Sequence, residues 1–99
     1  MNLDGVWTVE RVSGALPPMV GVRKEIDGSS GVTVAGPLRM RFDVRGNELR
    51  YRAPFVGLVD RLALVDGEWL GQATWFGHEF GRFRLRRVLA TRDLSGKPS

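Results

Sequence analysis

The sequence predicts an all-β protein: a small, closed or nearly closed up-and-down antiparallel barrel of about eight short strands. Thirteen glycines recur along the 99 residues and separate short segments. Within these segments apolar and polar residues alternate with period two, as in strands that bury one face. Helical periodicity is hardly visible, so no helix is expected to cover the apolar face. The sheet is therefore expected to bury that face by closing on itself, which also removes its exposed edges.

The expected strands lie between clusters of glycine, proline, asparagine, aspartate and serine, which favour turns. Short strands at regular spacing, joined by tight turns, are typical of a meander. The expected strands cover residues 6–12, 20–26, 31–35, 38–45, 48–53, 57–65, 68–76 and 80–87.

Tight turns also predict which residues face each other, because loop length fixes the register of a hairpin. For a two-residue loop at Gly46-Asn47, the expected pairs are Val44–Leu49, Phe42–Tyr51 and Met40–Ala53, with Asp43–Arg50 on the opposite face. For a two-residue loop at Asp66-Gly67, they are Leu64–Trp69, Leu62–Gly71, Asp60–Ala73 and Leu58–Trp75. With the last hairpin, described next, these two hairpins form three successive hairpins that share one apolar face.

The last hairpin is expected to have a three-residue loop at 77–79. The resulting pairs are Trp75–Gly81, Ala73–Phe83 and Gly71–Leu85. A two-residue loop would turn Arg82, Arg84 and Arg86 inward beside the tryptophans, and the longer loop is preferred for that reason.

Length and composition predict one domain, with residues 1–90 as the barrel and 91–99 as a flexible polar tail. The chain has no cysteine and a single histidine, so we expect no disulfide, no metal site and no cofactor. No long apolar run and no leader-like segment is visible, which favours a cytoplasmic protein that does not enter a membrane.

The net charge of +4 raises the question of a polyanionic partner. Ten of the fifteen cations, however, alternate with apolar residues on expected strands: Arg39, Arg41, Arg45, Arg50, Arg52, Arg61, Arg82, Arg84, Arg86 and Arg87. This pattern is typical of the solvated face of a half-buried sheet. Nucleic acid is therefore not the expected partner, although a nucleic-acid-binding barrel stays as an alternative.

The segment Leu3-Asp4-Gly5-Val6-Trp7 places a Gly-x-Trp pattern just before the first strand. It resembles the opening of the lipocalins and fatty-acid-binding proteins, the calycin superfamily, of which this chain would be a short member. The resemblance implies that Trp7 plugs the closed end and that an arginine late in the last strand packs across it. Arg87 is the best match, with Arg86 as the alternative if the strand is bulged. Such a cation–π contact, worth about 1 kcal/mol, would be a structural clasp.

Asp60 is the first candidate site residue. An inward carboxylate between Leu58 and Leu62 loses its hydration. The cost of this loss is high unless a cation or hydrogen-bond donors replace the water. Alternation predicts that Arg11 and Lys24 also point inward, and these residues and Tyr51 could supply the partners. Two interpretations stay open: a polar cluster that orients a ligand or moves a proton, and a satisfied internal ion pair or a carboxylate that escapes to water at a bulge.

The walls of a ligand pocket would be formed by aromatic and apolar residues, although core packing explains them equally well. The candidates are Met40, Phe42, Phe55, Trp69, Trp75 and Phe83. Gly71 and Gly81 would either make room for a ligand or ease the curvature of the barrel. His78 is expected in a turn. Residues 15–20, stiffened by Pro17 and Pro18, could form a lid, a contact with a second copy, or a plug.

The leading hypothesis is a barrel that binds an apolar or aromatic small molecule, with an anionic group on that molecule as an option. The alternative is a barrel-shaped enzyme, similar to the cyclases and isomerases of natural-product chemistry, that uses Asp60 and Tyr51. A homodimer formed through the last strand or through residues 15–20 is also left open.

Overall fold

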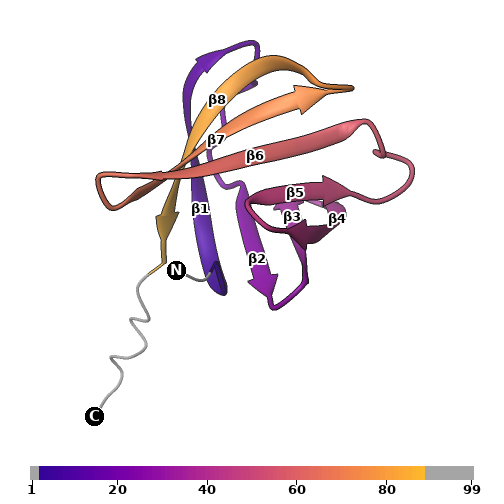
Figure 1. The fold of residues 1–99 in the computed structure, drawn as a ribbon, viewed down its shortest axis with the longest axis horizontal. Helices are drawn as coiled ribbons and strands as arrows, with labels where there is room; N and C mark the ends of the chain where they lie inside the picture. The colour runs from indigo at the N-terminus through magenta and orange to yellow at the C-terminus, as the bar shows by residue number, and fades with distance from the viewer. Residues whose placement is uncertain (1–2, 89–99) are drawn as a thin grey trace.

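A computed structural model describes residues 3–88, which form eight antiparallel strands closed into one barrel (Figure 1). The strands are β1 (Gly5–Gly14), β2 (Arg23–Asp27), β3 (Ser30–Ala35), β4 (Leu38–Arg45), β5 (Glu48–Tyr51), β6 (Leu58–Val65), β7 (Glu68–Trp75) and β8 (His78–Arg87). Each strand pairs with the next along the chain, and β8 pairs with β1. The predicted fold class is confirmed. The expected tail, residues 91–99, lies outside the described residues.

Two of the three predicted hairpins have the expected register. In the β4–β5 hairpin the pairs Phe42–Tyr51, Val44–Leu49 and Asp43–Arg50 are observed. β5 ends at Tyr51, so the expected pair Met40–Ala53 is not part of this ladder. All four pairs predicted for the β6–β7 hairpin are observed, including Asp60–Ala73.

The register predicted for the third hairpin is wrong, by three residues at the loop and by two along the rest of the ladder. Trp75 pairs with His78 across a two-residue loop at Phe76-Gly77, where both loop residues have positive φ. A bulge beside Thr74 then shifts the ladder, so that Ala73 faces Gly81 and Gly71 faces Phe83. Because the bulge inserts one residue, Phe83 still points inward and the neighbouring arginines still point outward. The short loop and the inward apolar row are therefore compatible.

The β1–β8 ladder closes the barrel and runs from Trp7–Arg87 to Gly14–Gly81. The contact expected between Trp7 and Arg87 is present, with the guanidinium carbon 4.1 Å from the indole ring centroid. Trp7 Nε1 also donates a hydrogen bond to the carbonyl of Leu3, and Arg87 donates one to the carbonyl of Asp4. These bonds tie the segment before β1 to the first and last strands.

β2 begins three residues later than predicted, and Val20, the first residue of the predicted strand, is 95% exposed. The β1–β2 ladder spans only Gly5–Thr8 on β1, and beyond it the two strands separate. Residues 15–22, which we call the β1–β2 connection, pass beside this gap. Val9 N donates to Val22 O, and Ala15 N donates to Phe80 O, so the connection is hydrogen-bonded on both sides of the opening.

Apolar side chains of the core gather at the end of the barrel where β1 begins and β8 ends. Leu3, Trp7, Ile26, Trp69 and Leu85 are buried there. Phe42 and Leu49, each 0% exposed, are the core's most deeply buried side chains. Among residues 3–88, no helix is long and apolar enough to cross a membrane. The other end of the barrel is incompletely filled, and the candidate site lies there.

We expect Gly71→Ala to lower the free energy of unfolding by about 1–3 kcal/mol, the usual cost of overpacking a core. A Cβ at position 71 would lie 2.2 Å from the ring of Phe83, which is 3% exposed and has little room to move. Urea unfolding followed by tryptophan fluorescence measures the change.

The companion variant for this test is Gly71→Ala/Phe83→Leu, which shortens the side chain that the new methyl group meets. It should be destabilised by less than the sum of the two single changes. If the double variant loses as much free energy of unfolding as the two single variants together, the proposed contact between the new methyl group and the Phe83 ring is contradicted.

Candidate functional site

Four polar side chains meet inside the barrel, each from a different strand. Lys24 on β2 and Thr33 on β3 are direct cross-strand neighbours. Tyr51 is the last residue of β5, and Asp60 lies on the adjacent strand β6. All four are 4–5% exposed. We call them the polar cluster.

The cluster is closely connected. Lys24 Nζ lies 3.0 Å from Asp60 Oδ2, 2.7 Å from the Tyr51 hydroxyl and 2.8 Å from Thr33 Oγ1. The Tyr51 hydroxyl lies 3.0 Å from Asp60 Oδ2 and 2.6 Å from Thr33 Oγ1. The Lys24 ammonium also lies 5.4 Å from the ring centroids of Tyr51 and Phe83, close enough for cation–π attraction.

Only one pattern of donors fits these contacts. The three N–H groups of Lys24 each have an acceptor, and Tyr51 donates its single proton to Asp60. Thr33 must then donate to Tyr51, because the Tyr51 proton is already used. Every donor of the cluster is occupied, and a buried charge of each sign is matched by the other.

This environment shifts two pKa values upward. Burial opposes the positive charge of Lys24, but the Asp60 carboxylate and the Tyr51 oxygen outweigh that effect, so the pKa of Lys24 is raised. Burial raises the pKa of Tyr51 to about 12, although the Lys24 ammonium acts in the opposite direction. At neutral pH Lys24 is therefore an ammonium ion and Tyr51 a neutral phenol.

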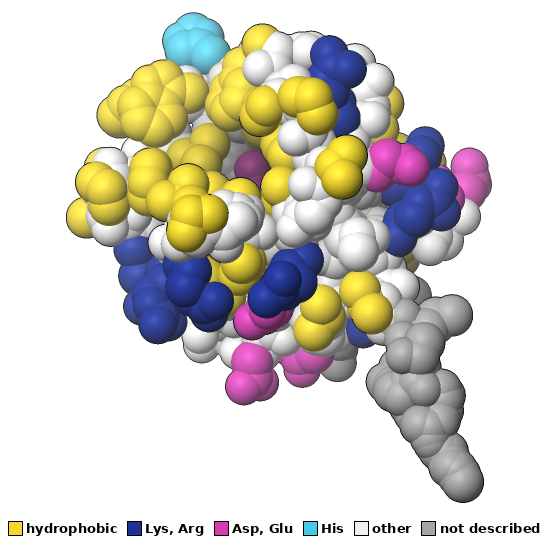
Figure 2. Space-filling view, turned by 180° about the vertical axis from the view of Figure 1, so that it is seen from behind, with side chains coloured by type: hydrophobic (Ala, Val, Ile, Leu, Met, Phe, Trp, Pro, Cys, Tyr) yellow, Lys and Arg dark blue, Asp and Glu magenta, His cyan; other side chains and the backbone are white. Residues whose placement is uncertain are grey.

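The cluster forms one wall of an interior cavity of about 300 Å³. Apart from the cluster, the side chains that line it are apolar: Val9, Leu16, Pro17, Pro18, Met19, Val22, Ala35, Leu38, Met40, Leu58, Ala73, Phe80 and Phe83. Figure 2 shows a hollow rimmed by hydrophobic side chains, with an acidic side chain visible at its bottom. Asp60 is the acidic residue among those that line the cavity. The volume is at the lower end of the range for small-molecule sites.

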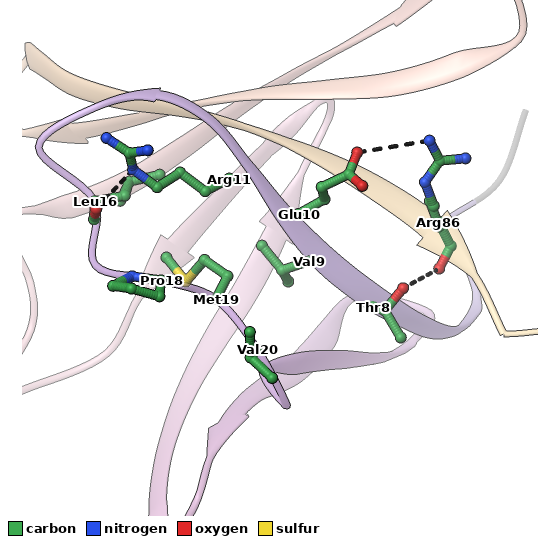
Figure 3. A pocket seen from close by; sticks show the side chains of 9 residues that line it. All are labelled: Thr8, Val9, Glu10, Arg11, Leu16, Pro18, Met19, Val20 and Arg86. Atoms are coloured by element: carbon green, nitrogen blue, oxygen red, sulfur yellow. Dashed lines mark hydrogen bonds and ion pairs between the residues drawn. The ribbon is translucent and has the colours of Figure 1, made fainter.

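The β1–β2 connection covers one side of this cavity. Leu16 is 8% exposed and packs against the backbone of Gly81, where a Cβ would lie 2.4 Å from its Cγ. Outside the connection, an open groove of about 690 Å³ runs along β1 (Figure 3). Leu16, Pro18 and Met19 line both spaces, so the connection is the wall between them. Of the three roles considered for residues 15–20, this geometry fits a partial plug or a lid.

Arg11 does not point into the barrel as expected. It is exposed, and its guanidinium donates to the carbonyl of Leu16 (Figure 3). The guanidinium also donates to the carbonyl of Gly14. A bulge in the β1–β8 ladder between Arg11 and Ser13 lies at this point. Arg11 therefore holds the β1–β2 connection and has no contact with Asp60.

The structure separates the other predicted site residues into two groups. Lys24, Met40, Tyr51, Asp60 and Phe83 line the cavity. Phe42 and Trp69 are buried in the core, and Phe42 packs edge-on against Tyr51. Phe55 is half-buried against the core without lining the cavity.

Trp75 was expected to point inward, but it is 48% exposed and packs against Phe76 outside the cavity. The physical reason is the two-residue loop, which places Trp75 at the very end of β7, beyond the part of the strand that faces the core. His78 directly follows that loop and is exposed.

Thr33 was missed by the sequence reasoning, because its neighbours Val32 and Val34 are the apolar residues of the strand. A signal was available in the Gly36-Pro37 turn. A two-residue loop there pairs Ala35 with Leu38 and Thr33 with Met40, which puts Thr33 on the inward row. Val32 and Val34 are buried on the outer face instead, opposite Arg41 and Arg39.

The outward arginines mostly face acidic side chains. Within residues 3–88 the ion pairs are Arg23–Glu25, Arg50–Glu48, Arg52–Asp43, Arg61–Glu48, Arg82–Glu79, Arg84–Glu10, Arg84–Glu68 and Arg86–Glu10. In the same part of the chain no group of three or more histidine, cysteine or acidic residues could hold a metal ion. The polar cluster is therefore the strongest candidate site.

Titration of the single tyrosine should report this environment directly. In the folded protein the phenolate absorbance of Tyr51 should rise with a pKa of about 12, against 10.0 for the free side chain. In concentrated urea it should return to about 10. A folded-state value near 10 would contradict the buried hydrogen-bonded phenol.

The same shift has a consequence for stability. Because folding raises the pKa of Tyr51, the folded state keeps its proton longer, and stability is lost as the pH rises from about 10 to about 12. The raised pKa of Lys24 acts in the same direction. Tyr51→Phe should reduce this alkaline loss when unfolding is measured across that window.

Removing one member of the ion pair should cost far more stability than removing both. Lys24→Met or Asp60→Leu alone leaves a buried uncompensated charge, at a cost of about 3–5 kcal/mol. Lys24→Met/Asp60→Leu removes both charges and should be more stable than either single variant. Urea unfolding at neutral pH measures all three, and a double variant no more stable than the singles would contradict a matched ion pair.

The comparisons with known proteins identify no relative of this chain. No protein-family profile, curated protein sequence or solved structure matches this chain.

Proposed function

We propose that this protein binds an apolar or aromatic small molecule inside its barrel. The observation that carries the proposal is the interior cavity of about 300 Å³, whose walls are apolar except for the polar cluster. A few converging polar groups in an apolar cavity are typical of sites that orient a small ligand. An engineered apolar cavity of about 150 Å³ accepts benzene, so this volume suits a molecule of one or two rings.

The two ends of the chain support a place for this barrel in the calycin superfamily. The Gly-x-Trp opening is accompanied by the packing of Arg87 on Trp7, which is the pairing that the resemblance implies. Members of that superfamily hold ligands inside the barrel. The proposed membership therefore agrees with the proposed binding role.

Binding fits the cluster better than catalysis does. A Lys24 that stays protonated is not a nucleophile, and a Tyr51 with a pKa of about 12 does not release its proton at neutral pH. Asp60 already accepts hydrogen bonds from both. The groups are arranged to hold their charges rather than to transfer protons.

A nucleic-acid partner is not favoured either. Electrostatic binding of polyanions requires clustered cations, and six of the ten outward arginines named above form ion pairs with acidic residues on the same face. The cytoplasmic location and the homodimer stay predictions from the sequence. Both edges of β8 carry ladder partners, so a dimer would not form through a free edge of that strand.

Filling the cavity should abolish binding. Ala73 is 3% exposed and lines the cavity, so Ala73→Leu would place three more carbon atoms in it. A panel of small aromatic compounds is screened with the unaltered protein by ligand-observed nuclear magnetic resonance. Compounds that bind should lose about tenfold or more in affinity with Ala73→Leu.

The matched control is Ala63→Leu, which adds the same atoms at an exposed position of β6, outside the cavity. It should leave the affinities unchanged. Binding that survives Ala73→Leu, or that falls equally in both variants, would show that the ligand does not occupy the cavity.

A further inference from the structure

The polar cluster has unused hydrogen-bond acceptors and no unused donor. All three N–H groups of Lys24 and the hydroxyl protons of Thr33 and Tyr51 have acceptors within the cluster. Among the described residues, the contacts to the Asp60 carboxylate end on Oδ2. The Oδ1 atom has no partner there.

The free carboxylate oxygen is accessible from the cavity. Asp60 lines the cavity. Because Oδ1 has no hydrogen-bond partner among the described residues and is nevertheless not a fully buried atom, part of its surface is exposed. An unpaired carboxylate oxygen in an apolar setting is a strong acceptor, because the hydration it has lost is not replaced. The position next to it is therefore suited to a hydrogen-bond donor.

The charge of the cluster decides which kind of donor fits. Lys24 and Asp60 sum to zero, and the other side chains that line the cavity are uncharged. A ligand carboxylate would find no free donor and would meet the Asp60 oxygen. A ligand ammonium would add a second positive charge close to Lys24 in a region of low polarity. A neutral O–H or N–H group has neither penalty.

We infer that the cavity selects neutral, mainly apolar molecules that carry one hydrogen-bond donor, such as a phenol, and that Asp60 Oδ1 accepts this hydrogen bond. The inference rests on the proposed binding function and narrows its ligand class. It also decides against the anionic ligand that the sequence left open. Lys24 has the role of positioning the carboxylate and balancing its charge rather than of binding the ligand.

The test compares three probes of nearly equal size and shape: para-ethylphenol, its methyl ether para-ethylanisole, and para-ethylbenzoate. They differ in offering a neutral donor, no donor and an anion, respectively. Affinities at neutral pH are measured by isothermal titration calorimetry with the unaltered protein. We expect the phenol to bind about tenfold or more tightly than the ether, since hydrogen bonds to charged acceptors are stronger than average, and the benzoate to bind most weakly.

The double variant Lys24→Met/Asp60→Leu removes the acceptor together with its counter-charge. It should still bind the ether, and the preference for the phenol should fall to about twofold or less. Even if this variant does not fold, the ranking of the three probes with the unaltered protein decides the question.

The outcomes separate the inference from the function on which it rests. Equal affinity for phenol and ether, or tightest binding of the benzoate, would overturn the donor preference while cavity binding stands. A phenol preference that persists in the folded double variant would assign the acceptor to another group and overturn the role of Asp60. If no probe binds and the wider panel of small aromatic compounds screened with the unaltered protein also yields no ligand, the binding function fails and the inference fails with it.

Discussion

The pairing of β1 with β8 is the constraint on which the rest of this structure depends. Lys24 and Asp60 lie on β2 and β6, four strands apart in the sheet, and they meet because the sheet curls until its first and last strands join. The ladder from Trp7–Arg87 to Gly14–Gly81 fixes that curvature. In an open sheet the same two charges would face solvent or lie far apart. Closure therefore creates both the apolar interior and the conditions under which an ion pair forms inside it.

The polar cluster divides the interior into two halves with different packing. On one side of the cluster, side chains such as Phe42, Leu49 and Trp69 are buried in the apolar core. On the other side, the charged and hydroxyl groups occupy the positions where further apolar side chains would meet, and a cavity is left beneath the β1–β2 connection. A small domain has few core positions, and using four of them for polar residues is costly for stability. A binding role gives a physical reason for that arrangement, because an apolar cavity alone cannot orient its occupant.

Much of the fold followed from local rules. Turn residues fixed the registers of the β4–β5 and β6–β7 hairpins, and those registers placed Tyr51 and Asp60 on the inward row. The third hairpin shows where such rules stop. Both the loop length and the inward direction of Phe83 were local signals, and they conflicted until a bulge beside Thr74 reconciled them. A bulge has no strong sequence signature, since it depends on how two strands share hydrogen bonds after they have paired.

What the sequence determined by itself was the alternation of apolar and polar residues, the turns, and hence an inward carboxylate that required a partner. Which partner it received was decided by the tertiary structure. Alternation predicted an inward direction for both Lys24 and Arg11. Arg11, however, lies beyond the Gly5–Thr8 part of β1 that pairs with β2, and it donates to the carbonyls of Gly14 and Leu16. Thr33 belongs to the cluster because it pairs with Lys24 on β2 and Met40 on β4. In the sequence, the apolar neighbours of Thr33 gave no indication of this inward direction. The alternation of residues along a strand gives the direction of a side chain, inward or outward. Its contacts depend on how far along the closed barrel each strand places it.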